Sequence, residues 1–211
     1  MKKIVIAISR EYGSGGRFIG EKLALELGIP FYDRELITMA SEHSGLSPEF
    51  IDTLEERSSQ SFLFNLATTA YMGASAYAQF DVPVDQKAYN SQTAIIRDLA
   101  DKGSCVIVGR CSDYILRNHP DCVKVFIYSS MEDKIHRVVE YYNVAPDKAK
   151  DKITKTNKHR ANYHKNFTNE KWGTPASHDI CINTAAVGID GAVKILKSFI
   201  EAAQQEAEKK A

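Results

Sequence analysis

The feature that most constrains the fold of this chain is a glycine loop that directly follows an apolar segment. Ile4–Ile8 (IVIAI) is continuously apolar and mostly β-branched, as in a parallel strand covered on both faces. The next residues, Ser9–Phe18, read SREYGSGGRF and hold three glycines within four positions. Apolar residues at helical spacing follow over Phe18–Leu27, and Gly28 ends that stripe. Strand, glycine loop and helix in this order predict a loop that holds phosphate.

The glycines have a physical reason in such a loop. Phosphate oxygens must come within hydrogen-bond range of backbone N–H groups, and a Cβ would obstruct that approach and disfavour positive φ angles. The helix that begins near Gly16 adds the positive end of its dipole. The predicted phosphate-binding residues of the loop are Gly13, Ser14, Gly15, Gly16 and Arg17. A glycine-rich turn that only joins a strand to a helix is the alternative.

The loop departs from the standard pattern G-x-x-x-x-G-K-[ST] in both alignments that its glycines allow. With Gly15 as the last glycine of the pattern, Gly16 stands at the lysine position and Arg17 at the Ser/Thr position. With Gly16 last, Phe18 takes the Ser/Thr position, but Arg17 keeps a positive charge where lysine belongs. We therefore expect Arg17 to supply the charge and to bind phosphate oxygens with two N–H groups.

The rest of the chain alternates between predicted strands and helices. Residues 35–100 are mostly helical in pattern and are interpreted as an inserted helical region on the acceptor side, which includes an Ala/Tyr/Phe-rich part at Phe62–Phe80. Further strands are expected at Cys105–Val108, Lys124–Tyr128 and Asp179–Ile182, and Pro30–Asp33 is expected to begin a short strand or its exit loop. Further helices are expected at Glu132–Tyr142, Pro146–Phe167 and Ile189–Ala207. This order predicts a single α/β domain over residues 1–211, with three layers and a parallel sheet.

Composition argues against some classes of protein. Lys+Arg and Asp+Glu both total 27, whereas nucleic-acid binders usually show a dominant basic field. No apolar run approaches the roughly 18 residues that a membrane span needs. The run after Lys2 and Lys3 is too short for a signal peptide. The four cysteines form no C-x-x-C pair and are interpreted as reduced thiols of a cytoplasmic protein.

Six short motifs are spread over nearly the whole chain, and their order is the one expected for a single protein family. They are Ile8–Arg17 (ISREYGSGGR), Leu27–Leu36 (LGIPFYDREL), Val106–Arg110 (VIVGR), Lys158–Tyr163 (KHRANY), Trp172–Gly173 and Asp179–Thr184 (DICINT). Together they resemble the cytidylate kinase-like family, a branch of the P-loop nucleoside monophosphate kinases. The resemblance implies the P-loop kinase fold and phosphoryl transfer from ATP, with Mg²⁺, to CMP or dCMP.

The chain departs from genuine cytidylate kinases on the acceptor side. Asp33 matches a family aspartate after the second strand, but Arg34 and the next residue replace the segment that follows it. Arg110 matches the arginine of the family's Gly-Arg-Asp motif, with Cys111 at the aspartate position and Asp113 two residues further on. These differences leave the acceptor open.

The predicted acceptor-binding residues are Arg10, Asp33, Arg34, Arg110 and Asp113. Arg110 follows a predicted strand, at the carboxyl end where open α/β sheets bind ligands. By resemblance it holds the acceptor's phosphate; the alternative is an arginine that closes a surface loop. Asp33 orients the water ligands of Mg²⁺ or the acceptor, or it only caps a turn. Arg10 either pins the glycine loop or contacts the acceptor.

A basic stretch, Lys148–Lys171, holds eight Lys and Arg residues and is predicted to belong to a lid over residues 146–172. Lys155, Lys158 and Arg160 would then close over the phosphates and exclude water. The alternative is a solvated helix face. Nucleic-acid binding through the interleaved aromatics is a second alternative, which the balanced charge opposes. The predicted catalytic residues are Arg17, Arg110, Lys158 and Arg160.

Two further expectations concern adenine and metal. The resemblance implies that Asn183 and Thr184 lie at the edge of the adenine site. A simple Asx or Ser/Thr turn is the alternative. His136, His159 and His164 form no ligand set with carboxylates, so we predict no metal site built by the protein alone. Mg²⁺ would arrive with ATP. The missing loop hydroxyl would be replaced by a nearby serine, at position 9 or 14, or by an additional water.

Three functions stay open on the sequence alone. The first is an ATP-dependent kinase of a CMP-like acceptor, and the second is a nucleotide-binding regulatory protein that has lost turnover. The third is a kinase of another small molecule. The segment Phe62–Phe80 is also compatible with a homodimer contact.

Overall fold

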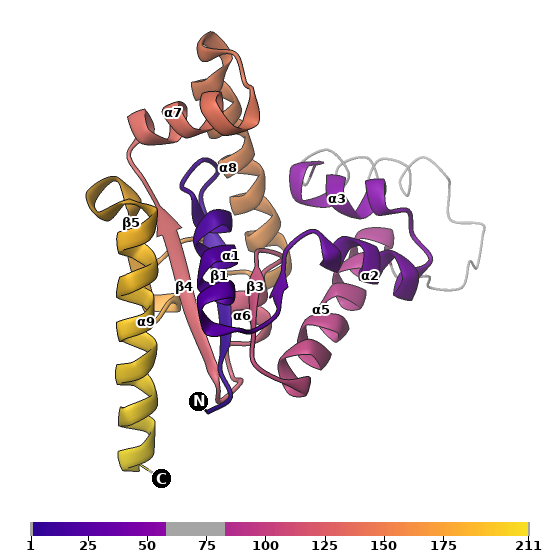
Figure 1. Cartoon of the computed structure of the whole chain (residues 1–211). Coiled ribbons are helices and arrows are strands. Elements are labelled where there is room, and N and C mark those ends of the chain that lie inside the picture. The colour runs from indigo at the N-terminus through magenta and orange to yellow at the C-terminus, as the bar shows by residue number, and fades with distance from the viewer. Residues whose placement is uncertain (1, 58–82, 211) are drawn as a thin grey trace, which may run out of the picture.

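A five-stranded parallel β-sheet lies at the centre of the structure (Figure 1). In spatial order its strands are β2 (Phe31–Tyr32), β3 (Cys105–Val108), β1 (Val5–Arg10), β4 (Cys122–Tyr128) and β5 (Ile180–Asn183). This computed structural model describes residues 2–57 and 83–210. Because β1 lies between β3 and β4, the chain switches sides of the sheet at β1. Ligands of open α/β sheets bind at the carboxyl ends of strands beside such a switch point.

Helices surround the sheet. In chain order they are α1 (Gly16–Leu27), α2 (Glu35–Ser44), α3 (Pro48–Arg57), α5 (Val84–Lys102), α6 (Ser112–Ile115), α7 (Met131–Tyr142), α8 (Pro146–Thr168) and α9 (Thr184–Lys210), with a 3₁₀ turn η1 (Pro175–Ser177) before β5. The strands and helices expected from the sequence are all present within the described residues, most with ends shifted by one or two residues.

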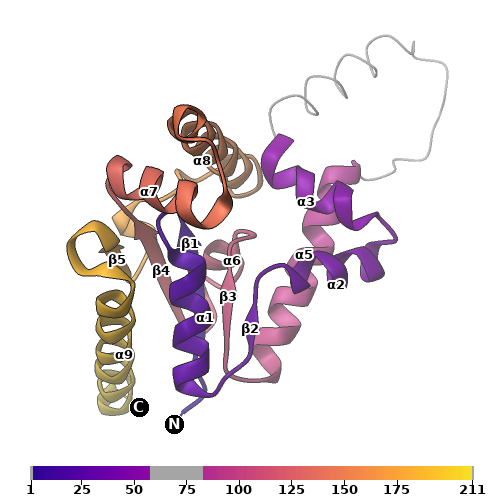
Figure 2. The ribbon, with the colours of Figure 1, turned by 45° about the horizontal axis from the view of Figure 1, so that its top comes forward.

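Strand β1 has no polar position before Ser9 because both of its faces are buried. Ile6 and Ile8 belong to a core that includes residues of α1 and α9. Val5 faces the opposite side and packs in a second core with Ile107 of β3 and with residues of α5. In Figure 2, α1 lies in front of the strands, with α9 to the left of β4 and α5 to the right of β2. The predicted three-layer α/β fold with a parallel sheet is confirmed.

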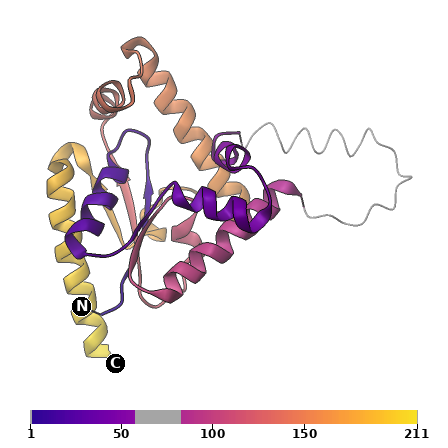
Figure 3. The ribbon, with the colours of Figure 1, turned by 45° about the vertical axis from the view of Figure 1, so that its right-hand side comes forward.

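Helices α2, α3 and α5 form a group beside the β2 edge of the sheet (Figure 3). Helix α2 packs on α3 and α5, and α3 also contacts α8. This group falls in the helical region expected over residues 35–100. The segment Phe62–Phe80 lies outside the described residues, so the interpretation of that segment stays a prediction.

Helix α8 is continuous and contains most of the predicted lid. Its buried residues Ala149, Ile153 and Tyr163 pack inward, and it contacts α7 and α3. Closure of residues 146–172 over a ligand stays a prediction.

Helix α9 begins at Thr184, five residues before the expected start at Ile189. Gly188, with φ +68°, is a non-helical residue within it, so the regular helix restarts where the apolar spacing predicts. None of the described helices combines the length and apolar character needed to cross a membrane. All four cysteines are free thiols.

Candidate active site

The glycine loop lies at the carboxyl end of β1 and leads into α1. Gly13 and Gly15 have φ angles of +78° and +85°, a conformation that favours glycine. Gly13 is also crowded, because a Cβ there would lie 2.8 Å from Val138 Cγ2 and 2.9 Å from the Lys134 carbonyl oxygen. Gly15 is the N-cap residue of α1 and has no side chain to cap it, so a phosphate can take that place.

Two basic side chains of α7 hold the loop from behind. Lys134 Nζ donates to Glu11 Oε2 at 2.7 Å, and the Lys134 side chain is only 7% exposed. Arg137 Nη1 donates to the Gly13 carbonyl oxygen at 3.3 Å. The shape of the loop is therefore supported by a helix more than 100 residues away in sequence.

Two arginines at the ends of the loop share one carboxylate. Arg17 Nε lies 3.0 Å from Asp33 Oδ2, and Arg10 Nη2 lies 3.9 Å from Asp33 Oδ1. The side chains of Arg10 and Asp33 are 13% and 14% exposed, whereas that of Arg17 is 44% exposed. Strand β2 therefore brings an acidic group to the edge of the glycine loop, where it neutralises part of the loop's charge.

Arg110 enters the same region from a strained turn after β3. Arg110 and Cys111 have φ angles of +57° and +55°, a conformation that costs a non-glycine residue about 1–2 kcal/mol. Arg110 Nη2 lies 3.2 Å from Asp52 Oδ1, and Nη1 donates to the Ile51 carbonyl oxygen at 3.4 Å. Helix α3 thus fixes the guanidinium. Strain held in this way is typical of functional sites.

Helix α8 presents Lys152, Thr156 and Arg160, four residues apart, to the space above the loop. Arg160 Nη1 donates to the Arg10 carbonyl oxygen at 3.1 Å, and its guanidinium carbon lies 5.7 Å from the centre of the Tyr12 ring. Arg160 therefore holds the main chain where the glycine loop begins.

These elements enclose a cavity of about 230 Å³. Most of the predicted site residues line it, namely Arg10, Gly13, Gly15, Gly16, Arg17, Asp33, Arg34, Arg110 and Arg160. Six cationic side chains, counting Lys152, stand against three acidic ones, Glu11, Asp33 and Asp52. The surplus of positive charge favours an anionic ligand.

Several predicted residues lie outside this cavity. Ser14 belongs to the loop but is fully buried, and its hydroxyl donates to the Glu11 carbonyl oxygen at 2.8 Å. Lys158 is exposed and is not part of the cavity lining. Thr184 is also buried and donates to the Ser14 carbonyl oxygen at 2.8 Å. Asn183 Oδ1 accepts from the Ala185 N–H at 3.1 Å, which is the local turn considered as the alternative.

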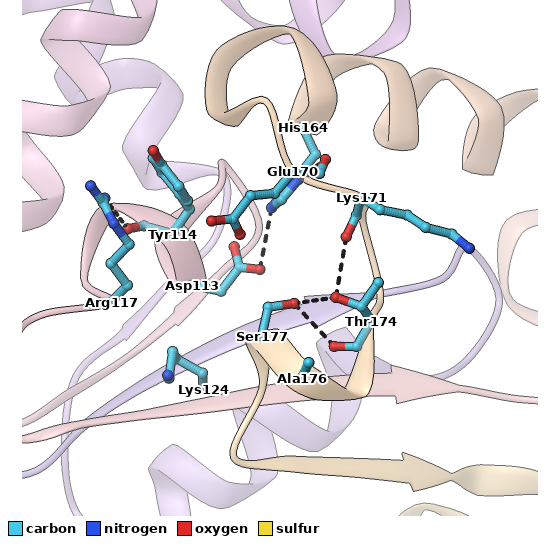
Figure 4. Close-up of a pocket in the computed structure, with 10 residues that line it drawn as sticks. All are labelled: Asp113, Tyr114, Arg117, Lys124, His164, Glu170, Lys171, Thr174, Ala176 and Ser177. Carbon is cyan, nitrogen blue, oxygen red and sulfur yellow. Dashed lines mark hydrogen bonds and ion pairs between the residues drawn. The ribbon is translucent and has the colours of Figure 1, made fainter.

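Asp113 lies at a second cavity of about 380 Å³ (Figure 4). Its Oδ2 is 3.1 Å from His178 Nε2 and 3.6 Å from His164 Nε2, and all three side chains are buried. Burial by itself raises the pKa of Asp113, but hydrogen bonds and charge attraction from the two histidines outweigh it and hold that pKa below its usual range. Burial lowers the pKa of His164, but the bond to Asp113 outweighs it and raises that pKa. Contact of Asp113 with an acceptor stays a prediction.

Two groups of site residues were missed by sequence reasoning. Lys152 and Thr156 share the helix face of Arg160, and their four-residue spacing within the basic stretch was the signal that could have found them. Lys134 and Arg137 lie on α7, and nothing in their sequence context links them to a loop that distant. Within residues 2–57 and 83–210, no three His, Cys, Asp or Glu side chains form a group that could hold a metal ion.

A parallel sheet with a glycine loop after its first strand, beneath a cationic cavity, defines a P-loop kinase fold. The chain belongs to the cytidylate kinase-like family, whose sequence profile matches residues 5–186. Phosphoryl transfer is therefore the chemistry of its class.

Solved structures share the fold of this chain. An uncharacterized protein from Eubacterium ventriosum ATCC 27560 is 30% identical, with a TM-score of 0.70, covering 94% of this chain and 99% of that one. Shikimate kinase from Bacteroides thetaiotaomicron (15% identity, TM-score 0.54, 95% and 99% covered) is similar in fold. A sugar kinase from Janibacter sp. HTCC2649 is also similar in fold, with 16% identity and a TM-score of 0.54, covering 94% of this chain and 95% of that one. No curated protein matches the chain.

Proposed function

We propose that the chain transfers a phosphoryl group from ATP to a small phosphorylated acceptor of the CMP or dCMP type. The observation that carries this proposal is the cavity in which the glycine loop meets cationic side chains of β1, α1 and α8 and of the turns after β2 and β3. Phosphoryl transfer needs alignment of donor and acceptor and positive charge around the transferring group, and little covalent help from the protein.

The residues divide naturally between donor and acceptor. Backbone N–H groups of the glycine loop would bind the donor phosphates, together with Arg17. Arg34 and Arg110 follow neighbouring strands and would bind the acceptor's phosphate with their planar guanidinium groups. Arg160 would add charge from above. No strong general base is required, since a phosphate monoester is already anionic near neutral pH.

The acidic residues of the cavity fit a magnesium ion that enters with ATP. Mg²⁺ keeps several waters and usually needs only one or two carboxylates besides the phosphates. Asp33 lies beside the loop and would hold the ion through its water ligands. Bound there, Mg²⁺ would neutralise charge on the phosphates. Ser14 does not fit this role because its hydroxyl is bound beneath the loop.

A kinase of a carboxylate-bearing small molecule is the second candidate. Arg34 and Arg110 both line the cavity. If they bind the acceptor as proposed, they could hold a carboxylate, because an arginine binds a carboxylate in the same bidentate way as a phosphate. The cavity therefore supports an acceptor that carries an anionic group, whereas it does not specify which base the acceptor carries.

The deciding experiment measures ADP release from ATP and Mg²⁺ with CMP, dCMP, UMP, AMP or GMP, and with a set of sugar acids and hydroxy acids. A reaction without acceptor is the control. Stimulation by CMP or dCMP supports the proposal, and stimulation only by carboxylic acids selects the second candidate. ATP binding without stimulated release by any of these acceptors would contradict the proposal and turn the search to other acceptors or to a regulatory role.

The face of α8 that lines the cavity leads to a second prediction, which concerns the effect of Lys152 on turnover. Lys152→Ala should lower kcat/KM for ATP about tenfold, or about 1.4 kcal/mol of transition-state stabilisation, because a positive charge near the phosphates is lost. Lys150→Ala is the matched control, since Lys150 is exposed two residues away and outside the cavity lining. Equal kinetics of the two variants would remove Lys152 from the site.

A further inference from the structure

Two glycines on different elements leave room for the side chain of Arg10. A Cβ at Gly16 would lie 2.6 Å from Arg10 Cβ and 3.1 Å from Arg10 Cγ. A Cβ at Gly109 would overlap the Arg10 guanidinium. The aliphatic part of Arg10 therefore passes beside the first residue of α1, and its charged end reaches the turn after β3. This path runs from the donor side of the cavity towards the acceptor side.

Position 16 is where a phosphate loop normally carries its lysine. The standard pattern places lysine directly after the last glycine, at the start of the helix. Gly15 has the left-handed φ and caps α1, and the helix begins with Gly16. The structure therefore favours the alignment with Gly16 at the lysine position over the one with Arg17 there. A lysine side chain at position 16 would collide with Arg10 where Arg10 now lies.

We infer that Arg10 replaces the loop lysine: its guanidinium, supplied from β1 instead of from α1, binds the donor's phosphate oxygens between the glycine loop and the acceptor. This inference rests on the proposed function, and it is an alternative to the expectation that Arg17 fills the lysine position.

Three observations support the role of Arg10. Its side chain lines the cavity and is 13% exposed, so its charge is partly shielded from solvent. Its carbonyl oxygen accepts a bond from Arg160 Nη1 at 3.1 Å, which fixes the position from which the side chain extends. Arg17, by contrast, is 44% exposed. Both arginines lie near Asp33, with Arg17 Nε at 3.0 Å and Arg10 Nη2 at 3.9 Å from its carboxylate oxygens. Position 17 corresponds to the Ser/Thr of the pattern.

The test moves the positive charge from position 10 to position 16 and measures the affinity for inorganic tripolyphosphate by calorimetry. This ligand has no base, and the measurement does not require turnover. Arg10→Gln keeps the aliphatic part and removes the charge, and Arg10→Ala removes both. Each should weaken binding about 10- to 100-fold, the range expected for charged hydrogen bonds. Gly16→Lys alone should also bind weakly because of the collision. The double variant Arg10→Ala/Gly16→Lys should regain at least tenfold over Arg10→Ala, because lysine then has space.

Thermal unfolding of each variant checks that it is folded, and Arg97→Gln, an exposed arginine of α5, is the charge control. The inference is overturned if folded Arg10→Gln binds like the wild type. It is also overturned if the double variant gains nothing while Arg17→Ala abolishes binding. Restored binding in a protein that transfers phosphate to no acceptor would keep the role of Arg10 and reject the proposed function.

Discussion

Asp113→Asn is expected to lower the free energy of unfolding by about 3–5 kcal/mol, because removing one partner of a buried ion pair leaves the other charge uncompensated. Asp113 Oδ2 lies at hydrogen-bond distance from His178 Nε2 (3.1 Å) and forms an ion pair with His164 Nε2 (3.6 Å), and the side chain is only 3% exposed. The cluster joins α6 to the end of α8 and to the segment before β5. Urea unfolding near pH 5.5 measures the loss.

The same variant should change the pH dependence of stability. Folding lowers the pKa of Asp113, so its contribution is present above the pKa of an unfolded aspartate, about 3.9, and is lost as pH falls through the folded pKa. Folding raises the pKa of His164, so its contribution is complete below about pH 6.5 and is lost as pH rises through the folded pKa. The difference between wild type and variant should therefore be largest between about pH 4 and 6.5.

Asp190→Asn is the matched control, because it breaks an ion pair with Lys22 that is exposed to solvent. We expect a much smaller effect, since exposed pairs are screened by water. A loss for Asp113→Asn that stays constant from pH 5 to pH 9 would mean that packing, and not charge, explains the role of the cluster.

Gly13→Ala is expected to destabilise the protein by about 2–5 kcal/mol, the sum of a strained φ and of overpacking. The added Cβ would lie within 3 Å of Val138 Cγ2 and of the Lys134 carbonyl oxygen, neither of which is a flexible side-chain end. The loop must then move, and a displacement of about 1 Å can cost about 100-fold in kcat. Urea unfolding and ADP release measure the two effects.

Gly28→Ala separates the two causes. Gly28 has φ +65°, but a Cβ there would meet nothing within 4 Å, so only the strain of about 1–2 kcal/mol remains. Because Gly28 ends α1 away from the cavity, turnover of this variant should be unchanged. If Gly13→Ala keeps wild-type turnover as well, the loop does not need its present shape for catalysis.

Much of the fold could be predicted because its causes are local. Ile4–Ile8 is apolar at every position, which is the pattern typical of a parallel strand whose two faces are both buried. The helix expected at Pro146–Phe167 also has local causes, since α8 begins with Pro146 and buries Ala149 and Ile153 at helical spacing.

The site was harder because its contacts connect distant segments. The sequence predicted that Arg10, Asp33 and Arg110 contribute, and for Asp33 and Arg110 the reason was a position after a strand. It could not predict that Gly16 and Gly109 make room for one side chain, because that depends on how α1 and the turn after β3 approach Arg10. Nor could it separate Lys158 from Lys152, because the inward face of α8 is decided by packing on the neighbouring helices.

Asp33 has a consequence for how the cavity would respond to salt. Since its carboxylate already lies near Arg10 and Arg17, an arriving triphosphate exchanges one anion for another at these arginines. Fewer small ions are then released to the solvent than when an anion binds to cations neutralised only by dissolved salt. The affinity of the loop for phosphate should accordingly depend only weakly on ionic strength. In effect the protein contains its own exchangeable counterion.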